Sequence, residues 1–85
     1  MDTSLSAQAH VSPVSDRLMQ ADIERIFATF GKIADIEFKR GTNVHSAVVT
    51  YASRLDCEQA VANLNGSELH GITVTVKQLD FHSSS

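Results

Sequence analysis

Basic side chains gather around one short turn of this 85-residue chain. Lys39 and Arg40 precede residues 41–43, which are turn-forming types, and His45 follows them. Such side chains donate hydrogen bonds to phosphate oxygens, so their grouping suggests a positive edge that grips a phosphate backbone. A solvated hairpin tip is the plainer interpretation of a small charge cluster. Lys77, later in the chain, is likewise either a phosphate contact or an ordinary solvated side chain.

The sequence gives little support for a catalytic, disulfide or metal site. Cys57 is the lone cysteine, which excludes an internal disulfide and a cysteine-rich zinc site. No base is paired with it, so we interpret it as a buried structural thiol. Asp35 and Glu37 lack partners for acid–base catalysis, and we expect them to repel phosphate or to pair with lysines or with a binding partner. The four histidines lack metal-ligand spacing, so we predict no metal site at His10, His45, His70 or His82. We also predict no bound cofactor and no enzymatic activity.

The composition describes one small soluble domain. Seven Lys+Arg against ten Asp+Glu give a net charge of −3, which argues against purely electrostatic binding of nucleic acid. No apolar run is long enough to span a bilayer, and the start of the chain lacks a signal-peptide layout, so we expect an intracellular protein without a membrane partner. We predict a domain over residues 9–79, with flexible segments at 1–8 and 80–85.

Two stretches have helical periodicity. Residues 16–30 place apolar side chains at steps of three and four, with Ser15 or Asp16 as the predicted cap. Gly31 is then predicted to end the helix in the left-handed conformation. A second apolar stripe runs from Leu55 to Leu64 after a cap-like Ser53, and residues 65–66 (Asn-Gly) are expected to end that helix.

Four stretches are typical of strands. Residues 33–39 alternate apolar and polar types, and residues 44–51 are rich in β-branched residues, so the pair predicts a hairpin. Residues 72–76 alternate strictly, and residues 9–14 form a weaker candidate that Pro13 should end. The order β-α-β-β-α-β predicts an α+β, ferredoxin-like sandwich with a four-stranded antiparallel sheet and two helices on one face.

Alternation along the strands predicts which side chains occupy the uncovered face of the sheet. These are mainly hydroxyls and charged groups, with one imidazole and one valine. The predicted set is His10, Ser12, Asp35, Glu37, Lys39, Ser46, Val48, Thr50, Thr73, Thr75 and Lys77.

The sequence resembles the RNA recognition motif (RRM) family over about residues 9–79. Residues 64–76 (LNGSELHGITVTV) are similar to the family's second-helix exit and last strand, and residues 22–33 (DIERIFATFGKI) are similar to its first helix. The spacing from Tyr51 to Gly66 also fits without a gap. The resemblance implies the same fold, single-stranded RNA as partner, and a module within a longer protein.

The chain departs from the family where RNA is usually bound. Residues 44–51 match the family's octamer, but its two RNA-facing aromatic positions hold Ser46 and Val48. In the hexamer at residues 9–14, His10 takes the stacking position, and Pro13 replaces an asparagine. Each base stack on a ring is worth about 1–3 kcal/mol, so these losses should weaken binding. Phe81 lies past the last predicted strand. It either folds over the uncovered face, where it replaces a missing ring or blocks the face, or is a disordered tail residue.

Two functions stay open. The first is an atypical RNA-binding module that uses loop and edge residues. The second is an RRM-fold module that binds a protein; acidic charge favours it, although residues 67–69 lack the Arg-x-Phe motif of one peptide-binding branch. A small enzyme lacks any supporting constellation. The candidate RNA-binding residues are His10, Lys39, Arg40, His45, Ser46, Val48, Lys77 and Phe81.

Overall fold

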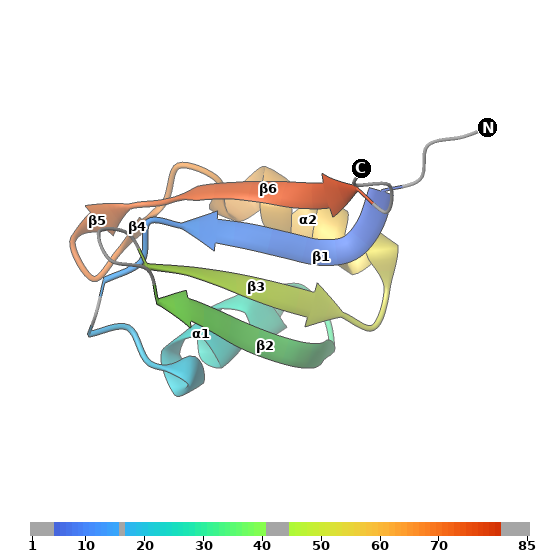
Figure 1. Cartoon of the computed structure of the whole chain (residues 1–85). Helices are drawn as coiled ribbons and strands as arrows, with labels where there is room; N and C mark the ends of the chain where they lie inside the picture. The colour runs from blue at the N-terminus through green and yellow to red at the C-terminus, as the bar shows by residue number, and fades with distance from the viewer. Residues whose placement is uncertain (1–4, 16, 41–44, 81–85) are drawn as a thin grey trace.

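A four-stranded antiparallel sheet carries two helices on one face (Figure 1). This computed structural model describes residues 5–15, 17–40 and 45–80. The sheet order is β2-β3-β1-β6, and the ferredoxin-like fold predicted from the sequence is confirmed. The main strands are β1 (Leu5–Ser12), β2 (Ile33–Arg40), β3 (His45–Tyr51) and β6 (Thr75–Asp80), and the helices are α1 (Gln20–Phe27) and α2 (Arg54–Leu64).

The first strand begins earlier than the sequence predicted. β1 spans Leu5–Ser12, so the strand begins four residues before the predicted start at residue 9. The Ser6 hydroxyl is buried and donates a hydrogen bond of 2.8 Å to the Leu79 carbonyl, while the Gln78 amide donates one of 2.9 Å to the Ser6 carbonyl. These polar contacts to β6 extend the strand without an apolar pattern. β1 ends before Pro13, as expected.

The first helix starts four residues later than predicted. Met19 is the N-cap of α1, and its backbone N–H donates a 3.0 Å hydrogen bond to the Asp22 carboxylate. The Ser15 hydroxyl instead accepts a 3.1 Å bond from the Arg17 N–H in the preceding turn, and Asp16 lies outside the described residues. After α1, the chain tightens into a 3₁₀ turn, η1 (Ala28–Phe30).

Gly31 has a different role from the predicted left-handed stop. Its φ of 163° is extended backbone that any residue can adopt. A Cβ at this position would instead collide with the side chain of Asp56, which α2 brings against the turn. The glycine is therefore needed for close packing between the two helical segments.

The predicted last strand, residues 72–76, is interrupted at Val74. β5 (Ile72–Thr73) pairs with β4 (Glu68–Leu69) in a separate two-stranded hairpin, and β6 starts at Thr75. The Val74 N–H donates to the Ser67 carbonyl at 2.9 Å, which turns the chain between the two sheets. Thr73 therefore does not belong to the uncovered face of the main sheet. The predicted end of α2 at Asn65 is confirmed, with Gly66 at a φ of 85°.

The core lies between the sheet and the helices and includes a buried hydrogen bond. Its largest fully buried side chains include Tyr51, Phe27, Leu18, Ile23 and Val11. The Tyr51 hydroxyl donates a buried 2.7 Å hydrogen bond to the Phe27 carbonyl, which joins β3 to the end of α1. In the described ranges, no helix is long and apolar enough to cross a membrane.

Replacing Tyr51 with phenylalanine (Tyr51→Phe) should lower the free energy of unfolding by about 1–2 kcal/mol, because the buried Phe27 carbonyl loses its donor. Urea denaturation measures this change. Thr29→Val removes an exposed hydroxyl and should stay within about 0.5 kcal/mol of the parent protein. Equal midpoints for the parent and Tyr51→Phe would show that the link contributes nothing.

Candidate nucleic-acid interface

The uncovered side of the main sheet, here called the open face, faces the viewer in Figure 1, with both helices behind it. Strand register places four side chains in one row across its middle. Glu37 on β2 is opposite Val48 on β3, Val48 is opposite His10 on β1, and His10 is opposite Lys77 on β6. His10 is half-buried, and Lys77 is exposed. An imidazole and an ammonium group therefore lie side by side on this face.

The two flanking rows are polar. In one of them, Lys39 on β2 is opposite Ser46 on β3, and Ser12 on β1 is opposite Thr75 on β6, so this end of the face carries three hydroxyls. The other row contains Asp35, Thr50 and Gln8, and the Gln8 amide donates a 3.3 Å hydrogen bond to the Thr50 hydroxyl. Gln8 was missing from the predicted face because the sequence pattern started the strand one residue too late to include it.

Charge is distributed unevenly across the open face. Asp35 and Glu37 project from β2 at one edge of the sheet, and Lys77 projects from β6 at the other. Lys39 is a cation at the end of β2. An anionic ligand is therefore favoured over β1 and β6 and repelled near the middle of β2.

Val48 lies at the centre of the face and is only 7% exposed. Its register partners are Glu37 on one side and His10 on the other. Among the described strand residues, the aromatic rings of Phe38 and Tyr51 lie on the helix side, so the open face offers a ring only at His10.

The predicted cluster around the β2–β3 turn is divided between the two faces. Lys39 points to the open face, whereas Arg40 lies on the helix side with its guanidinium carbon 5.7 Å from the centre of the Phe38 ring. His45 pairs with Arg40 and shares the helix side with Ala47; its Nδ1 is buried without a hydrogen-bond partner among the described residues. Neighbours in sequence were grouped although adjacent strand residues face opposite ways. Phe81 lies outside the described residues.

Known proteins with similar sequences and structures point to the same fold. The family model described as "RNA recognition motif" matches residues 11–75. The chain belongs to the RNA recognition motif family. Its RRM is similar to two curated relatives: a serine/arginine-rich splicing factor, RS2Z32, from Arabidopsis thaliana, and an RNA binding protein fox-1 homolog 1-like from Danio rerio.

Both curated relatives are much longer than this chain. The splicing factor is 28% identical over 85% of the chain and 24% of its own length. The fox-1 homologue is 32% identical over 79% of the chain and 18% of its own length. The chain thus spans about a fifth to a quarter of each relative, so the similarity concerns the RRM alone.

Solved structures share the fold at low sequence identity. The third RRM of Pes4 gives a TM-score of 0.84 at 21% identity over 93% of this chain and 98% of that chain. The third RRM of Mip6 gives 0.79 at 23% identity over 85% and 91%. One chain of a Sxl-lethal protein/RNA complex gives 0.76 at 18% identity over 85% and 46%.

The single thiol of this RRM lies away from the open face. Cys57 on α2 is fully buried. Burial, with a smaller contribution from Glu58, raises the pKa of its thiol to about 11. The neutral thiol is therefore the stable form at ordinary pH and is a poor nucleophile. The described residues also contain no group of three metal-ligating side chains.

The raised pKa of Cys57 predicts a loss of stability in alkali. Below its ordinary pKa of 9.0 the thiol is protonated in both states, and its stabilising contribution is complete. That contribution is lost as the pH rises through about 11, at a cost on the order of 2 kcal/mol. Burial also raises the pKa of Tyr51, which adds to the loss.

Urea denaturation of the parent and of Cys57→Ala across this alkaline range tests the assignment. The free energy of unfolding of the parent should fall more steeply with pH, because Cys57→Ala keeps only the Tyr51 effect. Parallel curves would mean that the thiol ionises equally easily in the folded and unfolded states.

Proposed function

We propose that this RRM binds single-stranded RNA across the β1 and β6 side of its open face. The observation that carries the proposal is the pairing of His10 with Lys77 on neighbouring strands, which puts a ring and a cation side by side. RNA-binding proteins hold unstacked bases on rings, including imidazole, and position the backbone through cations. A relative named as an RNA binding protein and a structural neighbour solved in a protein/RNA complex support the same partner.

Each group on this surface has a distinct task. A base stacks on His10, and Lys77 contacts the phosphate that follows or precedes it. The hydroxyls of Ser12, Ser46 and Thr75 lie on the same face toward one end of the strands, where they donate to base edges or to the ribose 2′-hydroxyl. Their short side chains leave room for a base to lie close to the sheet.

The carboxylates of β2 restrict the path of the RNA. Asp35 and Glu37 repel phosphate, so the backbone runs over β1 and β6 and reaches Lys39 only at the end of β2. Arg40 and His45 face the other way and make no contact in this arrangement. With Ser46 and Val48 where the family usually has rings, the affinity should be several kcal/mol below that of a three-ring platform.

Lys77→Gln should weaken binding of a fluorescein-labelled random RNA octamer about fivefold at low salt, or roughly 1 kcal/mol, because one phosphate contact is lost. The slope of log affinity against log salt should also fall by about 0.7. Fluorescence anisotropy over a salt series measures both quantities.

Lys32→Gln is the matched control, since it removes the same charge from an exposed lysine outside the open-face rows. It should change affinity less than twofold. Equal losses of affinity for the two variants would mean that binding depends on net charge alone, which would overturn the role of the open face. Absence of binding by the parent at low salt would overturn the RNA proposal itself.

Val48→Phe should raise RNA affinity at least fivefold, because it restores a ring at the centre of the face, where a stack is worth about 1–3 kcal/mol. The same anisotropy titration measures the gain. Thr73→Phe adds an equal ring on β5, outside the main sheet, and should leave affinity unchanged. No gain from Val48→Phe in a folded variant would place the RNA elsewhere.

Protein binding is the second candidate function. The carboxylates of Asp35 and Glu37 favour it, because they lie on the face where RNA would otherwise extend over β2. Retained folding without RNA binding at low salt would put this alternative first.

A further inference from the structure

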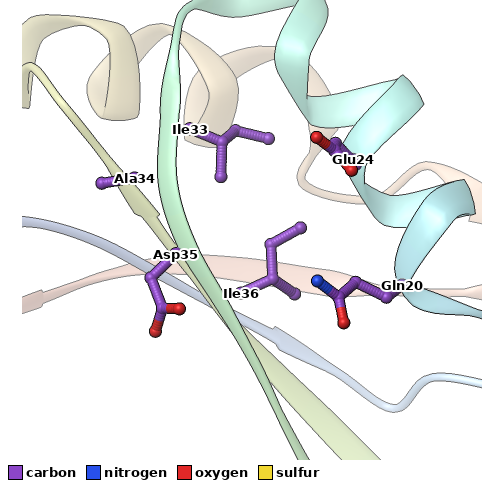
Figure 2. A pocket seen from close by; sticks show the side chains of 6 residues that line it. All are labelled: Gln20, Glu24, Ile33, Ala34, Asp35 and Ile36. Atoms are coloured by element: carbon purple, nitrogen blue, oxygen red, sulfur yellow. The ribbon is translucent and has the colours of Figure 1, made fainter.

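A shallow hollow of about 150 Å³ lies between α1 and β2, away from the His10–Lys77 pair. Figure 2 shows Ile33 and Ile36 pointing from β2 toward the helix, where Gln20 and Glu24 face them. Both isoleucines are half-buried and pack against the core, so they form the apolar part of a lining that is otherwise mostly polar. We call it the edge groove, lined by Gln20, Glu24, Ile33, Ala34, Asp35 and Ile36.

The groove runs along an open strand edge. β2 is the last strand on its side of the sheet, and no other described strand pairs with its outer edge. Its ladder with β3 is irregular between Ile33 and Asp35, which makes Ala34 an extra residue with only a methyl side chain. β2 is an edge strand, so the backbone N–H and C=O groups on its outer side have no strand partner among the described residues and can pair with an incoming extended chain.

Carboxylates flank this edge on both sides of the sheet. Glu24 is exposed on the helix side, and among the described residues it forms no ion pair. Asp35 points the other way in Figure 2, toward the open face, which it shares with Glu37. An extended peptide alternates its side chains between two faces, so at this edge it would meet a carboxylate on either face.

We propose that the edge groove docks an extended basic segment of a protein partner, which adds a strand to β2. Arginine or lysine side chains on the helix side lay their aliphatic stems over Ile33 and Ile36, and their charged ends contact Glu24. The alternate residues of the segment lie on the other face, where small hydroxyl side chains donate hydrogen bonds to Asp35 and Glu37. Nucleic acid and acidic peptides are repelled by the same carboxylates, and the surface is separate from the one assigned to RNA.

A peptide of four Arg-Thr repeats, labelled with fluorescein, is the probe, with four Glu-Thr repeats as its charge-reversed counterpart. Glu24→Gln should weaken binding of the basic peptide at least threefold. Glu68→Gln makes the same substitution at an exposed site on β4 and should change binding less than 1.5-fold, which gives a matched control. Amide chemical shifts should change mainly at residues 33–36 and 20–24.

Backbone methylation separates strand addition from simple charge attraction. Residues of one parity in a strand turn their N–H groups to the same edge. Two analogues of the basic peptide are therefore compared, one methylated at the backbone nitrogen of every arginine and the other at the backbone nitrogen of every threonine. One analogue should lose binding, and the other should keep it. Four results would each overturn the proposal. These are equal affinity of the two methylated analogues, equal losses of affinity in Glu24→Gln and Glu68→Gln, chemical-shift changes centred on other residues, and no binding of the basic peptide. RNA binding by Glu24→Gln should match the parent, whatever the peptide result.

Discussion

The central position of β1 is the constraint on which the rest of the structure depends. It pairs with β3 on one side and β6 on the other, so the main sheet would separate into two parts without it. Ala9 and Val11 on this strand are fully buried against the helix layer, with Cys57 and Ala60 of α2 in the same core cluster. His10, between them, must then point to the open face. One alternation therefore sets both the core and the proposed stacking ring.

The register that follows from this strand explains how much of the open face could be predicted from sequence. His10, Ser46, Val48 and Lys77 were expected on one face from alternation alone, and the pairing of the strands places them in adjoining rows. Alternation is a local rule that depends only on strand geometry, so it survives errors in strand ends. The same rule puts Lys39 and Arg40, neighbours in sequence, on opposite faces of the sheet, so their closeness in sequence does not make them one surface.

Other features were set by contacts between segments far apart in the chain. Ser6 joins the sheet because its hydroxyl reaches the Leu79 carbonyl, a partner 73 residues away that no local pattern indicates. Gly31 is required by the approach of Asp56 from another helix and not by its own φ. Thr73 leaves the main sheet because Val74 turns the chain toward Ser67. Such errors are typical of positions where tertiary contacts override local preference.

The uneven charge of the sheet links the two proposals physically. Carboxylates on β2 would weaken RNA binding if the whole face served that purpose, yet the same groups suit a basic peptide at the strand edge. Lys77 lies on the opposite edge strand, three strands from β2 in the sheet order, so the phosphate path and the acidic edge are kept apart. A net charge of −3 is thus compatible with RNA binding, because the local arrangement of charge, and not its sum, decides which ligand each surface accepts.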